Sequence, residues 1–369
     1  MGTIFEQVVI IGVGLIGGSL GMAIRKHRLA KKVVGIDLDP KSLALAQDLG
    51  AVDEWDTGYA PVKDGELVVL AAPIGANLSI LEKISPLLPP QAVVTDVGST
   101  KSEFVANAER VLADKNPFVG GHPMAGAESS GVGRADPYLF ENAFYLLTPT
   151  ERTAVQVLTR MEALVKGVGA KPMIMDPMTH DIIAAAISHL PHLGAAALVQ
   201  TAAAVDAEHP ATLALAAGGF KDTTRIASGN PGLWKEICYS NKEQIIRMID
   251  QFAGHLFAMR QALAAGLEQE FEEQLVGAKA IRDQIPAKTK GYWPFLDEVI
   301  VTIPDRPGTI GEVAAILGAE KINIDDIEIL RVREGEGGTL RLGFAKEGSA
   351  IRAVEVLKSR GYAAWPRNS

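Results

Sequence analysis

The sequence predicts an α/β protein whose N-terminal part is a doubly wound parallel sheet of the Rossmann type. Short β-branched runs alternate with helical stretches as far as about residue 175, which is typical of that fold. From there to about residue 286 strand runs disappear and alanine dominates, which predicts an all-helical domain. After a linker at 287–296, the segment 297–369 has the βαββαβ order of a ferredoxin-like module. We therefore expect domains at 1–175, 176–286 and 297–369.

The composition is that of a soluble globular chain. Its 369 residues include 37 glycines and 20 prolines, with 22% charged and 47% hydrophobic residues, which excludes collagenous, disordered and coiled-coil proteins. A net charge of -8 without a basic patch argues against nucleic acid as a partner. The single cysteine, Cys238, cannot form an internal disulfide, and the N-terminus lacks a signal-peptide pattern, so we expect a cytoplasmic protein.

The N-terminal region begins with a βαβ unit. The apolar run Gln7–Val13 predicts a strand, a small-residue helix follows through Arg25, and Lys32–Ile36 predicts the next strand. Further strands are expected at Leu67–Ala71, Ala92–Asp96, Phe118–Gly120, Phe144–Leu147 and Lys171–Met175, with helices at Lys41–Leu49, Lys101–Asp114 and Ala154–Lys166.

The helical region contains two unusual stretches. Ile182–Val205 has no charged residue, but its histidines, Pro191 and polar residues favour a buried helix, kinked at Pro191, over a membrane span. Farther on, apolar residues recur at alternating spacings of four and three, which predicts a long amphipathic helix: Ile245, Ile249, Phe252, Leu256, Met259 and Leu263. Together these two helices predict a homodimer formed through this region.

The C-terminal module is predicted from strand and helix patterns joined by glycine-rich turns. Strands are expected at Asp297–Ile303, Ile324–Val332, Thr339–Phe344 and near Ala363, and helices at Thr309–Glu320 and Ser349–Arg360.

A glycine motif follows the first strand and opens the first helix. In Gly12-Val-Gly14-Leu-Ile-Gly17 the first glycine permits a tight turn, the second admits a pyrophosphate and the third lets helix and strand pack. Asp37 ends the second strand, where a carboxylate binds the adenosine ribose and repels the 2′-phosphate of NADP. We therefore expect NAD as the cofactor.

Two further motifs follow later strands of the predicted sheet. Asp96-Val-Gly-Ser99-Thr-Lys101 lies at the edge where such sheets bind ligands, and Ser99 or Thr100 is also expected to cap the next helix. Gly120-Gly-His122-Pro places a histidine in what we interpret as a loop after a strand. A lone histidine is more often structural, but this position favours catalysis.

The helical region adds cationic and histidine residues. Ser188-His189-Leu-Pro-His192 lies in the uncharged helix, and Lys221 and Arg225 are spaced to share a helix face. A solvated surface is the simpler explanation for the two cations. A cationic pocket for an anionic substrate explains both them and the buried histidines. No cluster has the spacing of metal ligands, so we expect no metal.

Taken together, GVGLIGGS, DVGSTK, GGHPMAG, SHLPH and GFKDTTRIASGNPGLW resemble the motifs of bacterial prephenate dehydrogenases of tyrosine biosynthesis, in the same order. PDRPGTIGEVAAILGAEKINIDDI resembles the signature of a C-terminal ACT regulatory domain. The resemblance implies NAD-dependent oxidative decarboxylation of prephenate to 4-hydroxyphenylpyruvate by a homodimer.

The resemblance also implies roles for individual residues. His122 becomes the catalytic histidine, and Ser99 a polar neighbour of the reacting hydroxyl. His192 and Arg225 are expected to bind the carboxylates of the substrate. The residues that line or close the pocket are Ser188, His189, Lys221 and Trp234. The expected cofactor-binding residues are Gly12, Gly14, Leu15, Ile16, Gly17, Asp37 and Ser99.

The ACT resemblance implies that tyrosine binds the C-terminal module and inhibits the enzyme. The expected site is the loop after the module's first strand, together with a residue that faces a neighbouring module: Asp305, Arg306, Pro307, Gly308 and Asn323. The alternative is a purely structural dimerisation module.

Three other functions stay open from the sequence. Arogenate, which carries an amino group on the side chain, is the closest competing substrate. A 3-hydroxyacid dehydrogenase would use a catalytic lysine, for which Lys221 is the candidate, but it leaves the His122 motif and the ACT module unexplained. A ligand-sensing protein would bind NAD and an amino acid without catalysis.

Overall fold

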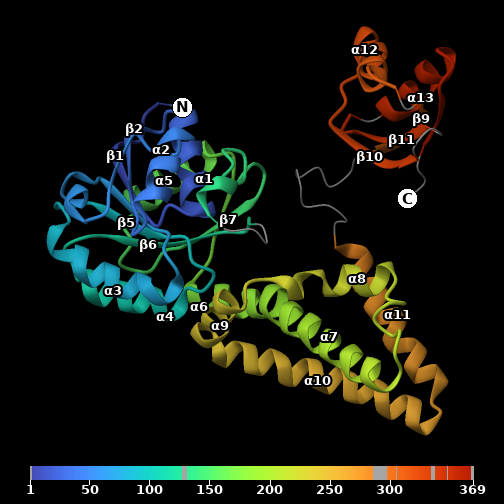
Figure 1. Cartoon of the computed structure of the whole chain (residues 1–369), viewed down its shortest axis with the longest axis horizontal. Coiled ribbons are helices and arrows are strands. Elements are labelled where there is room, and N and C mark those ends of the chain that lie inside the picture. Colours follow the sequence, from blue (N-terminus) through green and yellow to red (C-terminus); the bar gives the residue numbers. More distant parts are fainter. Residues whose placement is uncertain are drawn as a thin grey trace. The chain divides into compact units, whose positions relative to one another are not determined.

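The computed structural model describes residues 2–126, 131–285, 297–304, 306–333, 337–346 and 348–366. The chain divides into two compact units, Met1–Ile285 and Pro286–Ser369 (Figure 1). The expected linker at 287–296 lies outside the described residues.

The first unit contains an eight-stranded sheet in the order β3-β2-β1-β4-β5-β6-β7-β8 within its described residues. The strands are β1 Phe5–Ile11, β2 Ala30–Ile36, β3 Glu54–Asp56, β4 Leu67–Leu70, β5 Val93–Asp96, β6 Phe118–Pro123, β7 Phe144–Thr148 and β8 Lys171–Ile174. The helices are α1 Leu15–Lys26, α2 Pro40–Asp48, α3 Ile74–Ile84, α4 Ser102–Leu112 and α5 Val155–Gly167. The predicted Rossmann-type fold is confirmed, with the difference that β6 and β7 pair antiparallel.

Both faces of this sheet are covered. This is shown by successive residues of β1, which belong to two different hydrophobic clusters. In β1, Val8 and Ile10 join one hydrophobic cluster, while Val9 and Ile11 join the other. Val8, Val9 and Ile10 are fully buried. A nearly continuous apolar strand is therefore a consequence of helices lying on both sides.

The helical region is built from α6 Pro177–Ala184, α7 Leu190–Glu208, α8 Gly218–Thr224, α9 Pro231–Ser240, α10 Lys242–Ala265 and α11 Glu268–Gln284. A π-helical segment, Ala185–His189, joins α6 to α7. The sequence predicted a kink at Pro191, and the irregular segment of the helix is found just before that residue. Pro191 itself lies in the first turn of α7, directly after this segment.

The prediction of a buried helix at 182–205 does not hold within one chain. The continuous helical run Pro177–Glu208 is long and apolar enough to cross a membrane, and only 28% of its most apolar stretch is buried. Ile187 is 64% exposed. The predicted amphipathic helix is α10, which lies beside α7 in Figure 1, and its Leu256 is 52% exposed. Exposed apolar faces such as these are typical of interaction surfaces.

The second unit is a four-stranded antiparallel sheet with the order β10-β11-β9-β12. Its elements are β9 Asp297–Ile303, α12 Thr309–Ala319, β10 Asp326–Arg333, β11 Gly337–Phe344, α13 Ser349–Ser359 and β12 Ala363–Pro366, which confirms the ferredoxin-like topology. Val299 and Val301 pack with Leu317 and Leu357 in its core. Arg341 is 1% exposed and forms ion pairs with Glu298, Asp326 and Glu328.

Candidate active site

The glycine motif has the geometry that a dinucleotide needs. Gly12 has a φ of +97°, and a Cβ on it would lie 2.5 Å from the backbone of Ala71. A Cβ on Gly17 would lie 2.0 Å from the Gly12 carbonyl oxygen, whereas a Cβ on Gly14 would meet nothing within 4 Å. The fold itself thus requires the first and third glycines. The space beside Gly14, at the uncapped N-terminus of α1, fits a pyrophosphate.

Asp37 lies against this loop. Its Oδ2 accepts a hydrogen bond of 2.9 Å from the Val13 backbone N–H, and its Oδ1 accepts one of 2.7 Å from Leu38 N–H. The carboxylate is therefore fixed where β2 ends, next to the turn that would hold the cofactor. This is the place at which a Rossmann acidic residue binds the ribose hydroxyls.

A buried ion pair joins the end of β5 to β6. Lys101 Nζ contacts the Asp96 carboxylate and donates to the Gly121 carbonyl oxygen at 2.8 Å. Lys101 is fully buried, and burial lowers the pKa of its ammonium in spite of Asp96. A Cβ on Gly121 would lie 2.5 Å from the Asp96 carbonyl oxygen, so glycine permits this close approach. The pair fixes the backbone directly before His122.

The start of α4 differs from the expected cap. The helix has no side-chain cap from its own loop, and the Asp181 carboxylate instead accepts the backbone N–H groups of Lys101 and Ser102, each at 2.8 Å. Thr100 bonds Ser240 at 3.0 Å through their hydroxyls. Ser99 is half-buried and directly precedes Thr100, Lys101 and Ser102. The helical region therefore holds the loop that carries Ser99.

His122 begins a hydrogen-bonded chain of three side chains. It lies within β6, opposite Leu146, rather than on the loop that the sequence predicted. Its Nδ1 is 2.8 Å from His180 Nε2, and His180 Nδ1 is 2.8 Å from Asp181 Oδ1. Because a carboxylate only accepts, His180 carries its proton on Nδ1 and accepts at Nε2. His122 therefore donates from Nδ1, which leaves a lone pair on its Nε2.

The surroundings keep this chain in the charge state that a base requires. Burial, with the electrostatic interactions of His180, Lys101 and His189, holds the pKa of His122 well below its usual range, so the imidazole is neutral near pH 7. Burial acts to raise the pKa of Asp181, but hydrogen bonds from His180 and from Ser102 outweigh it and lower that pKa. Asp181 is therefore the fixed negative end of the chain.

The other predicted histidines continue the site. His192 stacks on Trp234, with ring centroids 3.6 Å apart and planes at 10°, and His189 meets Trp234 edge-on at 6.2 Å. Burial lowers the pKa of His189 to about 4, and it also lowers the pKa of His192. Both rings are thus neutral near pH 7. Each keeps a buried nitrogen without a partner among the described residues, Nε2 of His189 and Nδ1 of His192.

The two predicted cations do not share one helix. Lys221 is exposed on α8, which ends at Thr224, and Arg225 begins a 3-10 turn, Arg225–Ser228. The backbone of Ile226, in the same turn, forms a hydrogen bond with His192. Ser188 is half-buried in the π-helical segment.

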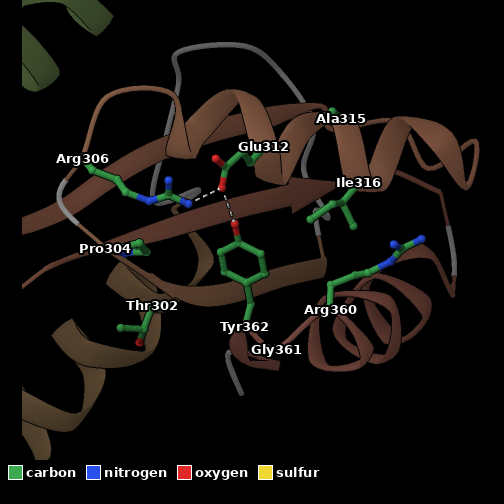
Figure 2. Close-up of a pocket in the computed structure, with 9 residues that line it drawn as sticks. All are labelled: Thr302, Pro304, Arg306, Glu312, Ala315, Ile316, Arg360, Gly361 and Tyr362. Atoms are coloured by element: carbon green, nitrogen blue, oxygen red, sulfur yellow. Dashed lines mark hydrogen bonds and ion pairs between the residues drawn. The ribbon is translucent and has the colours of Figure 1, made fainter.

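The C-terminal module has an open cavity of about 680 Å³, shown in Figure 2. Arg306 forms an ion pair of 2.8 Å with Glu312, and the Tyr362 hydroxyl donates to the same carboxylate at 3.1 Å. The cavity is lined by Thr302, Pro304, Arg306, Glu312, Ala315, Ile316, Arg360, Gly361 and Tyr362.

Of the five residues predicted to form the regulatory site, Arg306 lines this cavity. Pro307 and Gly308 lead into α12, where Gly308 has a φ of +94°. Asn323 bonds Asp325 at 2.7 Å and precedes β10, at the opposite edge of the sheet from β12. Asp305 lies outside the described residues.

Sequence reasoning missed three residues of the first unit's site: Lys101, His180 and Asp181. His180-Asp181 follows the helix start at Pro177 and is 58 positions from His122, so no local pattern joins them. Lys101 ends the motif that begins at Asp96, but the motif does not reveal that its ammonium is fully buried.

Comparisons with known proteins identify the family. Residues 20–174 match the family model described as "Prephenate dehydrogenase, nucleotide-binding domain", and residues 176–277 match "Prephenate dehydrogenase, dimerization domain". Residues 298–356 match the ACT domain. The prephenate dehydrogenase of Bacillus subtilis is 38% identical over 96% of both chains, and that of Lactococcus lactis is 33% identical over 96% of this chain and 98% of its own.

Solved structures agree with this assignment. Prephenate dehydrogenase from Aquifex aeolicus, in complex with hydroxyphenyl propionate and NAD+, is 36% identical with a TM-score of 0.72 over 76% of this chain and 98% of its own. Synechocystis arogenate dehydrogenase is 32% identical with a TM-score of 0.68 over 76% of this chain and 99% of its own. The chain therefore belongs to the prephenate dehydrogenase family of oxidoreductases and has a C-terminal ACT domain.

Proposed function

We propose that this enzyme catalyses the NAD-dependent oxidative decarboxylation of prephenate to 4-hydroxyphenylpyruvate. The observation that carries the proposal is the chain from Asp181 through His180 to His122, because it leaves a neutral His122 with a free Nε2 lone pair. A neutral imidazole held in one tautomer is suited to accept a proton from a hydroxyl group.

The chemistry of prephenate requires such a base. Its ring carries a carboxylate and, on the opposite carbon, a hydroxyl. As hydride leaves that carbon, His122 accepts the hydroxyl proton, so that no positive charge builds up on the ring. Loss of the ring carboxylate as CO₂ makes the ring aromatic, and the phenol oxygen regains the proton from His122. No net proton is released, and aromatisation supplies the driving force.

The remaining roles in substrate binding follow the predicted set. We assign Ser99 to the reacting hydroxyl, and His192 and Arg225 to the carboxylates of the substrate. Trp234 holds His192 by stacking at 3.6 Å, which orients its ring. Ser188, His189 and Lys221 line or close the pocket. A charge-assisted contact from Arg225 fixes one negative end of the substrate.

NAD is the proposed cofactor, and when bound it supplies the nicotinamide that accepts the hydride. The turn at Gly12, Gly14 and Gly17 would hold its pyrophosphate, with Leu15 and Ile16 in the first turn of α1. Asp37 would bind the ribose hydroxyls and repel the extra phosphate of NADP. Ser99 would lie near the nicotinamide end.

The test is to mix the purified protein with NAD⁺ and prephenate and to follow the absorbance of NADH. Turnover is expected with prephenate and NAD⁺, and little with NADP⁺. Arogenate, the substrate named for the Synechocystis relative, is the second candidate and is compared in the same assay. If NADH forms neither with prephenate nor with arogenate, the proposed reaction is rejected and a ligand-sensing protein is favoured.

We also propose that the enzyme is a cytoplasmic homodimer joined through the helical region. The exposed apolar residues of α7 and α10, such as Ile187 and Leu256, would then be covered by a second copy rather than by a membrane. The family model that matches 176–277 is described as a dimerization domain, which supports this choice. Sedimentation equilibrium without detergent is expected to give twice the chain mass.

The ACT domain is proposed to bind tyrosine and to inhibit the enzyme. The predicted loop contributes Arg306 to a cavity that also offers the Glu312 carboxylate and the apolar Ile316, groups that match the ends and ring of an aromatic amino acid. Inhibition requires that tyrosine bind one conformation of the enzyme better than another.

We propose the following domains for the whole chain. Residues 1–175 bind the cofactor, residues 176–286 bind the substrate and form the dimer, and residues 297–369 are regulatory.

Tyrosine titration of the full-length enzyme, a Glu312→Gln variant and a chain ending at Pro286 tests this role. Inhibition is expected in the full-length enzyme and is expected to weaken or vanish in the other two. Equal inhibition of all three would mean competition at the active site. No inhibition in any would leave a structural dimerisation module.

A further inference from the structure

Asn241 occupies a position where asparagine ordinarily caps a helix. It directly precedes α10, yet its side chain makes no capping hydrogen bond there. The residue is only 5% exposed. Its Nδ2 instead donates to the backbone carbonyl of Asp181 at 2.8 Å and lies 3.3 Å from His189 Nδ1. The side chain therefore serves the histidine site rather than the helix.

These contacts define the tautomer of His189. The Asp181 carbonyl oxygen can only accept, so the atom of Asn241 that faces it must be the amide nitrogen. The same nitrogen presents its second hydrogen to His189 Nδ1. Nδ1 therefore accepts, and the proton of a neutral His189 resides on Nε2.

The donor that results has no protein partner. His189 is 1% exposed, and its Nε2 is buried without a hydrogen bond among the described residues. The ring lies edge-on to Trp234, and the titratable groups that act on it are Asp181 and His180, with His122 close enough for the two histidines to interact electrostatically. A buried N–H without a partner is costly unless a ligand supplies the acceptor.

We propose that Asn241 is a positioning residue that fixes His189 as a neutral hydrogen-bond donor to an oxygen of the bound substrate. The choice of ligand rests on the proposed function. A neutral donor orients a substrate oxygen without forming an ion pair, which matters where a carboxylate must later leave as CO₂. Burial keeps the ring uncharged, because it lowers the pKa of His189 to about 4.

The first test observes the tautomer of His189 directly in the wild-type enzyme. Histidine ¹⁵N–¹H spectra of the wild-type holoenzyme with NAD⁺ are expected to show His189, identified by its loss in His189→Phe, with a protonated Nε2 and an unprotonated Nδ1. Addition of 4-hydroxyphenylpyruvate is expected to shift the Nε2 proton. A protonated Nδ1, or an Nε2 proton that the product does not shift, would overturn the proposal.

The second test replaces the donor with an acceptor. In Asn241→Asp the carboxylate accepts from His189 Nδ1, so a neutral His189 then presents a lone pair to the substrate. The KM for prephenate is expected to rise about tenfold, with a smaller change in kcat and none in the KM for NAD. Protonation of His189 restores its Nε2 proton, so part of the affinity is expected to return as pH falls from 8 to 6.

Asn116→Asp is the matched control. Asn116 is 6% exposed and also donates from Nδ2, to the carbonyls of Pro89 and Ala92, and neither of these contacts involves a histidine. It is expected to lose stability as Asn241→Asp does, with no change in the His189 tautomer or in the pH dependence of KM. If both variants behave alike, Asn241 is merely structural. Wild-type protein inactive on prephenate but with the expected tautomer would reject the proposed reaction and not the assignment of the tautomer.

Discussion

The active site and the ACT domain are each organised around a buried cation, but the two cations have different surroundings. Lys101 is fully buried with a single carboxylate partner, Asp96, which is itself 2% exposed at its side chain. Arg341 is paired with three carboxylates, Glu298, Asp326 and Glu328, whose side chains are 24%, 39% and 41% exposed.

The difference explains what each cation does. Burial lowers the pKa of Lys101, and its charge helps to lower the pKa of His122. For Arg341, burial acts to lower the pKa, but the hydrogen bonds that its guanidinium donates to Glu328 and Asp326 outweigh burial and raise that pKa. Lys101 therefore tunes a neighbouring reactive group, whereas Arg341 holds three strands together.

The largest effect is expected on the active-site side of this comparison. His122→Asn removes the proposed base and should lower turnover by roughly 10²–10⁴-fold, because that is the contribution of a positioned acid or base. Binding of NAD and the fold should be retained. Turnover with prephenate and fluorescence titration of NADH are the measurements. Near-wild-type turnover would show that His122 is not the base.

The two cations themselves are compared by matched substitutions to methionine. Lys101→Met leaves the buried Asp96 uncompensated, so the free energy of unfolding should fall by about 3–5 kcal/mol. Arg341→Met leaves carboxylates that water can still reach, so the loss should be smaller and turnover without tyrosine unchanged. Urea unfolding and turnover of both variants check this. Equal losses in stability would mean that exposure of the partners does not matter.

The neutral histidines predict how stability depends on pH. The pKa of His189 is about 4 in the folded chain and about 6.5 in an unfolded one, so the unfolded chain binds the extra proton first. Stability is therefore complete above pH 6.5 and falls by up to about 3 kcal/mol as pH drops toward 4. Urea unfolding at pH 7, 5.5 and 4.5 should show this slope. It should be reduced in His189→Asn and kept in His209→Asn, where the residue is exposed.

A smaller effect is expected where the site reaches solvent. Arg225 is exposed and should contribute one charge-assisted contact of roughly 1.5–3 kcal/mol to the substrate. Arg225→Ala should therefore raise the KM for prephenate about tenfold or more, with little effect on the KM for NAD. Steady-state kinetics with each substrate varied separate the two constants. An unchanged KM for prephenate would return Arg225 to a solvated surface.

The sequence predicted the fold well because its signals are local. The strand at Gln7–Val13, the turn at Gly12 and the βαββαβ order each follow from residues that are close along the chain. The site was predicted only in part, because its key contacts join distant segments. Neither the antiparallel pairing that places His122 inside β6 nor its contact with His180 has a local signal.

The helical region also shows what a local sequence pattern cannot predict. The apolar periodicity of α10 was predicted correctly, but periodicity does not tell whether the cover comes from the same chain. The sequence predicted a buried helix at 182–205, but only 28% of the most apolar stretch of the run Pro177–Glu208 is buried. The homodimer predicted from these two helices is the arrangement that would cover it.

The π-helical segment Ala185–His189 makes the site sensitive to the number of residues in this helix as well as to their identity. Each residue of an α-helix turns the chain by about 100°. Deleting one alanine from the segment would allow a regular helix, but it would rotate α7 by that angle and carry His192 away from Trp234. Changes of residue type at Ala186, which is exposed, should be tolerated far better than any insertion or deletion. The number of residues between His180 and His192 is thus constrained. A related chain with an insertion or deletion in this helix is expected to have lost the site.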